Sequence, residues 1–159
     1  MNILEKKVEA MMQLCVADNE KDKEKIREEI RYYLMQRQRD SIDPEQEIRR
    51  ILLELGSPDH LVGHPYVIRA ILLVIQDRLY INNITFGLYP QLAVEFDTTP
   101  ARVERAIRHL IEVTWSRGDL DILEHYFGNT VSASRGKPTN GEFIARIANV
   151  VRANVQRAA

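Results

Sequence analysis

Four charged side chains in the segment Thr98–Gly118 have the chemistry of nucleic-acid recognition. They are Arg102, Glu104, Arg105 and Arg108. Cations are unfavourable near the start of a helix, because the helix dipole is positive there. A phosphate backbone with guanine edges would offset this cost, since arginine binds both. A mixed Arg and Glu face is also common on helices that only contact solvent, so both interpretations stay open at this point.

The segment Thr98–Gly118 is predicted to be an amphipathic helix. Thr99 can cap its first turn, and Pro100 suits the next position because no amide hydrogen bond is needed there. The side opposite the charges carries apolar or small residues at helical spacing, and we expect it to face the core. These residues are Val103, Ala106, Ile107, Leu110, Val113 and Thr114.

A second helical pattern lies directly before this segment. Between Ile84 and Phe96, apolar residues recur every four positions. Pro90 lies inside the pattern and predicts either a kink or two short pieces. Asp97 and Thr98 leave only a very short turn before the next helix. Two helices joined in this way, the second with exposed arginines, are typical of a helix-turn-helix whose second helix enters the major groove.

The remaining chain also has helical periodicity, and no strand is predicted. Further helices are expected at about residues 2–16, 21–39, 44–55, 66–80, 119–127 and 141–155. The apolar run from Val67 to Ile75 could form a strand, but it exceeds strand length and contains no turn signal, which favours a helix. The expected fold class is all-α: a helical domain with a helix-turn-helix and an N-terminal helical hairpin.

The hairpin is predicted to have only a narrow apolar seam. Its apolar residues would be Leu4, Val8, Met11 and Cys15 in the first helix, with Ile3, Met12 and Leu14 widening the stripe, and Ile26, Ile30, Tyr33 and Leu34 in the second. Two helices alone rarely bury enough surface to be stable, so we expect docking onto the rest of the chain or onto a second copy. The expected domains are residues 1–43, the extension, and residues 44–159, the effector domain.

Composition narrows the classes of function. A net charge of −1 means that any nucleic-acid role must rest on local arrangement. One cysteine excludes an internal disulfide framework and a cysteine-based zinc site. No apolar run could span a bilayer and no signal sequence is visible, so a cytoplasmic, nucleoid-associated protein is expected. The histidines lack metal spacing and catalytic motifs are missing, so no metal, cofactor or enzymatic activity is expected.

Several blocks between Ile48 and Val155 match one known family. The strongest are Thr98-Thr99, Arg102 to His109, Ile111-Glu112-Val113, Trp115 to Gly118, Phe127-Gly128, Lys137 to Asn140 and Glu142-Phe143-Ile144. Further matches are Leu55-Gly56, Pro58, His60, Ile84-Thr85 and Leu88-Tyr89-Pro90. Together they resemble the C-terminal effector domain of the stage zero sporulation protein A family, the response regulator that starts endospore formation in Firmicutes.

This resemblance implies sequence-specific binding to double-stranded DNA through the helix of residues 100–117. It implies base contacts by Arg102, Glu104 and Arg105, and arginine does fork onto guanine while glutamate accepts from cytosine. Such contacts would favour an element with adjacent C and G. Backbone or auxiliary contacts are implied for Thr98, Thr99, Arg108, Lys137, Thr139 and Asn140. The family binds tandem sites as paired subunits, which implies a homodimer. The RNA polymerase sigma subunit or a related regulator is a further expected partner.

The resemblance does not extend to the front of the chain. The family carries a receiver domain of about 120 residues, an α/β unit, and no strand followed by a phosphoacceptor Asp can be placed before Asp43. We therefore expect the hairpin to replace the receiver, for dimerisation or partner docking. The expected function is a transcriptional regulator. The alternative is a protein-interaction module that does not bind DNA and modulates a full-length related regulator.

Overall fold

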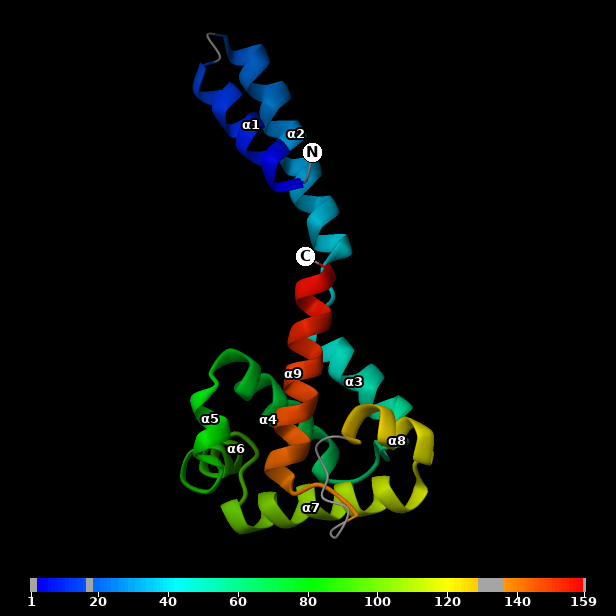
Figure 1. Cartoon of the computed structure of the whole chain (residues 1–159). Coiled ribbons are helices and arrows are strands. Elements are labelled where there is room, and N and C mark those ends of the chain that lie inside the picture. Colours follow the sequence, from blue (N-terminus) through cyan, green and yellow to red (C-terminus); the bar gives the residue numbers. More distant parts are fainter. Residues whose placement is uncertain (1–2, 17–18, 129–135, 159) are drawn as a thin grey trace. The chain divides into compact units, whose positions relative to one another are not determined.

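The computed structural model describes residues 3–16, 19–128 and 136–158. These residues form nine α-helices and one π-helical segment without any strand, which confirms the all-α prediction. The elements, shown in Figure 1, are α1 (Ile3–Val16), α2 (Glu20–Asp40), α3 (Pro44–Glu54), α4 (Gly63–Gln76), α5 (Leu79–Asn82), η1 (Ile84–Leu88), α6 (Tyr89–Glu95), α7 (Pro100–Arg117), α8 (Leu120–Phe127) and α9 (Asn140–Ala158). None of these described helices has the length and apolar character needed to cross a membrane.

The chain divides into two compact units. One comprises Met1–Ile42 with Ala158–Ala159, and the other is Asp43–Arg157. Asp43 is therefore the first residue of the second unit, and it caps α3 by accepting a hydrogen bond from the Gln46 amide at 3.1 Å. Pro44 occupies the first helical position, where its missing N–H leaves no hydrogen bond unmade.

In the first unit, α1 and α2 pack against each other as the predicted hairpin. Ala10 is buried between them, and Leu14, Ile26 and Ile30 are half-buried. The main positions predicted for the seam of α1 are wrong, because Val8, Met11, Met12 and Cys15 are exposed, and of the described members only Leu14 is half-buried. In α2, Leu34 is exposed as well, and the side chains of Leu4 and Tyr33 lie outside the described part.

The error in α1 has a physical reason. Periodicity shows that a helix has an apolar stripe, but it does not show which neighbour covers that stripe. The face of α1 turned toward α2 follows positions 6, 10 and 14, where the small side chain of Ala10 permits close approach. The most apolar stripe of α1 is therefore left outside the hairpin.

The core of the second unit is built around α4. Four of its side chains, Val67, Ala70, Ile71 and Val74, are at most 2% exposed. The helix packs against α3, α6 and α7. Its first residue, Gly63, lies so close to α7 that a Cβ atom there would come within 2.2 Å of the Ala106 carbonyl oxygen. This glycine therefore sets how closely α4 approaches α7.

The boundaries of α4 differ from the prediction of residues 66–80. The helix begins three residues earlier because Pro65 occupies its first turn, where proline leaves no hydrogen bond broken. It ends at Gln76, since Asp77 is extended with φ −139° and ψ 112°. The residues after Asp77 form the separate short helix α5.

Pro90 divides the second predicted helix into two pieces, one of the two predicted outcomes. The first piece, η1, is a π-helix in which the amide of Leu88 donates to the Asn83 carbonyl at 3.0 Å. The second piece, α6, starts at Tyr89 and carries Pro90 in its first turn. The change from π-helix to α-helix thus falls directly before the proline, where an irregular helical turn is common.

Candidate nucleic-acid interface

A short turn joins α6 to α7. The amide of Thr98 donates to the Ala93 carbonyl at 2.9 Å, and the amide of Asp97 donates to the Val94 carbonyl at 3.4 Å. These are the two bonds of a Schellman motif, in which the residue after the C-cap of the helix adopts a left-handed conformation. Asp97 has this conformation, with φ +48°. The turn therefore fixes the direction in which α7 leaves α6.

The start of α7 is capped as predicted. The Thr99 hydroxyl oxygen accepts a hydrogen bond from the Arg102 amide at 3.3 Å. Pro100 follows in the first helical turn. The first turn of α7 is thus held by its own residues, and its side chains are free to project outward.

The inner face of α7 packs into the core. Val103, Ile107, Leu110 and Thr114 are buried as predicted, and Ile111 is also buried. Two other residues of the predicted stripe, Ala106 and Val113, are only half-buried. Trp115 is half-buried, with its ring centroid 5.0 Å from that of Phe127 in α8. This tryptophan therefore packs against the helix that follows.

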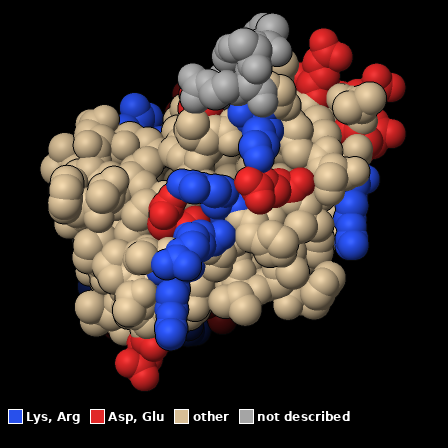
Figure 2. Space-filling model, turned by 90° about the horizontal axis from the view of Figure 1, so that it is seen from below, with Lys and Arg blue, Asp and Glu red and all other residues tan. Residues whose placement is uncertain are grey.

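The outer face of α7 carries alternating charges. Arg102, Arg105, Arg108 and Glu112 are exposed, and Glu104 is half-buried. Figure 2 views the molecule from the side on which α7 lies and shows basic and acidic side chains side by side across it. The surface is thus mixed in sign and is not a continuous basic patch.

The arginines of this face differ in their partners. Among the described residues, neither Arg102 nor Arg105 is held in an ion pair. Arg108 by contrast pairs with Glu104, one turn earlier on α7. The two unpaired guanidinium groups therefore keep their full hydrogen-bonding capacity for another molecule.

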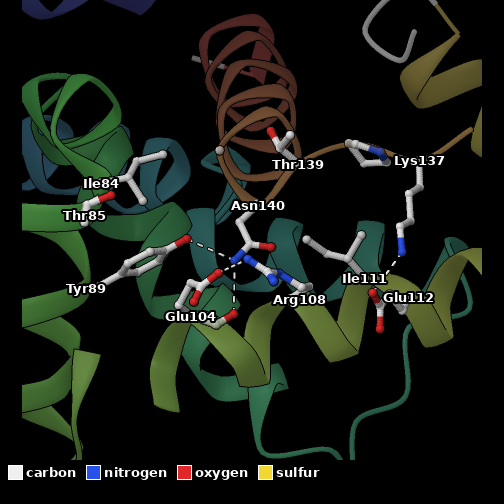
Figure 3. A pocket seen from close by; sticks show the side chains of 12 residues that line it. Ile84, Thr85, Tyr89, Glu104, Arg108, Ile111, Glu112, Lys137, Thr139 and Asn140 are labelled. Atoms are coloured by element: carbon white, nitrogen blue, oxygen red, sulfur yellow. Dashed lines mark hydrogen bonds and ion pairs between the residues drawn. The ribbon is translucent and has the colours of Figure 1, made fainter. Parts of the chain in front are cut away.

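A groove of about 540 Å³ lies beside this face (Figure 3). It is bounded by η1, by α7 and by the segment that leads into α9. On one side Lys137 reaches the Glu112 carboxylate at 2.8 Å. This hydrogen-bonded ion pair lowers the pKa of the Glu112 carboxyl group. Lys137 thus brings a cation next to the outer face of α7.

Asn140 joins three helices at the other side of the groove. Its Nδ2 donates to the Tyr89 hydroxyl at 3.0 Å and to the Glu104 carbonyl oxygen at 3.1 Å (Figure 3). Burial raises the pKa of the Tyr89 hydroxyl, and the bond from Asn140 acts in the opposite direction. Asn140 therefore ties the first residue of α9 to α6 and to the second turn of α7.

Thr139, the residue before Asn140, caps α9. The Thr139 hydroxyl accepts from the Glu142 amide at 3.2 Å, and the Glu142 carboxylate accepts from the Thr139 amide at 2.9 Å. This reciprocal pair is a capping box. Thr139 is therefore the N-cap of α9.

The structure brings most of the predicted contact residues together. Around the groove and the outer face of α7 lie Arg102, Glu104, Arg105, Arg108, Lys137, Thr139 and Asn140. Thr98 and Thr99 lie at the turn before α7, where Thr98 uses its amide and Thr99 its hydroxyl inside the protein.

Two residues of the groove were not singled out from the sequence. Tyr89 has a buried hydroxyl that accepts from Asn140, and apolar periodicity gives no sign of a hydroxyl partner. Glu112 holds Lys137, which is 25 positions away in the sequence. Its position four residues after Arg108 was the one available signal, because it places Glu112 on the charged face.

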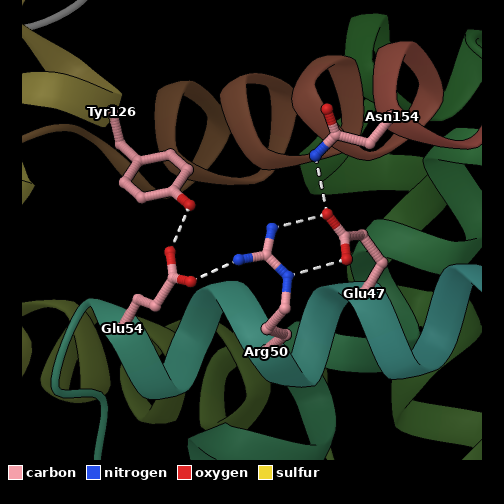
Figure 4. A network of polar contacts seen from close by, with 5 residues as sticks. All are labelled: Glu47, Arg50, Glu54, Tyr126 and Asn154. Carbon is pink, nitrogen blue, oxygen red and sulfur yellow. Dashed lines mark hydrogen bonds and ion pairs between the residues drawn. The ribbon is translucent and has the colours of Figure 1, made fainter. Parts of the chain in front are cut away.

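A second charged cluster lies between α3, α8 and α9 (Figure 4). Arg50 donates two hydrogen bonds to Glu47, at 2.7 and 2.9 Å, and also pairs with Glu54. Asn154 donates to Glu47 and the Tyr126 hydroxyl donates to Glu54, each at 2.6 Å. These contacts lower the pKa of Glu47, mainly through Arg50. Burial and the Glu54 carboxylate raise the pKa of Tyr126 to about 12.

Within the described residues, no group of three histidine, cysteine, aspartate or glutamate side chains could hold a metal ion. His64 is buried, and its Nδ1 has no hydrogen-bond partner there. Burial lowers the pKa of this histidine, so the neutral form is favoured in the folded protein. Neither observation adds a ligand-binding side chain to the interface on α7.

A known protein family matches more than half of the chain. The model of the C-terminal domain of sporulation initiation factor Spo0A matches residues 48–151, which is well over half of the chain and includes α4 to α8 entirely. The match agrees with the resemblance drawn from the sequence blocks and with the all-α fold. The chain therefore belongs to the family of the Spo0A C-terminal domain, a helical DNA-binding domain of sporulation transcription regulators.

Proposed function

We propose that α7 enters the major groove of duplex DNA and reads bases with Arg102, Glu104 and Arg105. The observation that carries this proposal is the state of the two arginines. Both are exposed in the first two turns of a helix that follows a tight turn, and neither is neutralised by a described residue. Arginine can donate two bonds to guanine O6 and N7, and glutamate can accept from cytosine N4.

Glu104 would change partners on binding. It is paired with Arg108 in the free protein. Arg108 would move toward a phosphate, which releases the Glu104 carboxylate for a cytosine amino group. An element with adjacent C and G is the sequence that suits these side chains.

We propose that Lys137 and Arg108 are the main backbone contacts. Both cations would exchange a carboxylate partner for phosphate. Thr98, Thr99 and Thr139 remain proposed auxiliary contacts. Asn140 has donated both of its N–H groups inside the protein, so it can reach a phosphate only by giving up one of these bonds. Its contribution is therefore proposed to be mainly the placement of α7.

The test is binding of the full chain to duplexes selected from a random pool. We expect selected sequences to share adjacent C and G, with an affinity that falls steeply as salt rises. The Arg105→Ala variant should lose about 1–3 kcal/mol of discrimination against a mutated element, because one bidentate base contact is removed. Fluorescence anisotropy at several salt concentrations measures both quantities.

Arg78→Ala is the matched control, since Arg78 is exposed and has no ion pair among the described residues. It should bind like the wild type. Equal discrimination by Arg105→Ala and the wild type would refute base reading by this arginine. Failure to enrich any sequence would favour the alternative, a protein-interaction module that modulates a related regulator. The sigma subunit of RNA polymerase stays a predicted partner in either case.

A further inference from the structure

DNA binding leaves the exposed apolar stripe of α1 unexplained. Val8, Met11, Met12 and Val16 are 50%, 52%, 66% and 77% exposed, and Cys15 between them is exposed too. Val8, Met11 and Cys15 follow a spacing of three and four, which places them on one side of the helix. Soluble proteins rarely leave such a continuous apolar surface without a partner.

Among its described side chains, the hairpin buries little apolar surface. Ala10 is the one apolar side chain of α1 and α2 that is fully buried among those described. Isolated short helices are marginal in water, and their stability comes from packing of an apolar face. The α1–α2 contact leaves the apolar face of α1 free, so another element must cover it.

The charges around the stripe indicate what that element is. The residues of α1 and α2 include eight acidic and nine basic side chains, interspersed along both helices. Several are already paired within the hairpin, as Lys23 is with Glu20 and Arg27 with Glu24. A strongly acidic or basic partner would meet as much repulsion as attraction on such a surface. A neutral, alternating surface is complementary to itself under a two-fold rotation.

We infer that the stripe of Val8, Met11, Met12 and Cys15 is a self-association surface. Two hairpins pack with their α1 helices facing each other and form a four-helix bundle from two copies of the chain. Such a bundle buries the apolar face that one hairpin leaves exposed. The inference concerns the hairpin alone, so its failure and a failure of DNA binding are distinguishable.

The first experiment is sedimentation equilibrium of the full chain without DNA. We expect twice the 18.4 kDa of one chain. Met11→Glu places a charge at the centre of the stripe and should return the mass to that of one chain, a twofold loss. Met35→Glu is the matched control, because Met35 is 61% exposed on α2 and lies outside the stripe. This control should stay dimeric, with unchanged circular dichroism in both variants.

The second experiment uses Cys15, the single cysteine of the sequence, as a reporter. Its alkylation should be slow in the wild type and in Met35→Glu but fast in Met11→Glu. A wild type of single-chain mass would overturn the inference, including a monomer with a protected Cys15, which would indicate docking within one chain. A dimer that Met11→Glu does not dissociate, or that Met35→Glu dissociates equally, would also overturn it.

Discussion

The outer face of α7 and the cluster around Arg50 contain the same residue types but different arrangements. On α3, Arg50 is fixed by two carboxylates of its own helix, and these are held in turn by Tyr126 and Asn154 from other helices. On α7, Arg105 has no such partner among the described residues. A charged side chain that is bonded across helices stabilises the fold, whereas one left unbonded at the surface can bind a ligand.

Removal of Glu47 is expected to have the largest effect on stability. The Glu47 side chain is only 6% exposed and accepts hydrogen bonds from Arg50 and Asn154. Glu47→Ala leaves both donors without this partner and should lower the free energy of unfolding by about 2–3 kcal/mol. Urea denaturation measures the change. Duplex affinity should be unchanged in the folded variant. A loss of affinity with no loss of stability would show that the cluster around Arg50 acts in binding and not in folding.

The pH dependence of the same cluster gives a second test. Arg50 lowers the pKa of Glu47 below its usual 4.5, so the folded protein binds fewer protons than the unfolded chain near that pH. The stability from Glu47 is therefore present above pH 4.5 and is lost as the pH falls through the folded pKa. The difference in unfolding free energy between wild type and Glu47→Gln should shrink as the pH falls from 7 to 3. A constant difference would show that charge is not the cause.

Tyr89 has a structural role that also affects the binding face, because it accepts a hydrogen bond from Asn140 and Asn140 in turn holds α7. Tyr89→Phe removes the acceptor of Asn140 and should cost about 1 kcal/mol of stability. We also expect a reduced ratio of specific to non-specific affinity, since the second turn of α7 is less firmly placed. Tyr80→Phe is the control, as Tyr80 is half-buried and its hydroxyl has no bond to a described residue. An unchanged ratio in Tyr89→Phe would limit Asn140 to a purely structural role.

The sequence predicted α7 well because several independent signals agree there. Thr99 and Pro100 mark its start, and the spacing of Val103, Ile107 and Leu110 marks its inner face. The turn before it was recognised only by its length. Its left-handed residue is Asp97, where glycine is the usual signal, so the Schellman geometry could not be read from composition.

Contacts between distant residues were the main part that the sequence did not show. Asn140 bonds Tyr89 across 51 positions, and Lys137 bonds Glu112 across 25. Local spacing carries no information on such pairs. The same limit explains the wrong seam of α1, since an apolar stripe indicates that a face is covered but not which neighbour covers it.

The smallest expected effect concerns the carboxylate that competes with DNA for Lys137. Glu112 and Lys137 are both 45% exposed, so their ion pair should add little to stability. Glu112→Gln frees the lysine for phosphate and removes a negative charge from the face. We expect about a threefold tighter binding to any duplex, specific or not, because phosphate contacts carry no sequence information.

Glu45→Gln is a close control for this change. Glu45 is also 45% exposed and pairs with Arg49 on α3, outside the groove beside α7. It should leave duplex affinity unchanged at every salt concentration. If Glu112→Gln tightened only the specific complex, Lys137 would be acting near a base and not on the backbone. If both variants tightened binding equally, the change in net charge would explain the effect. The release of Lys137 from Glu112 would then not be its cause.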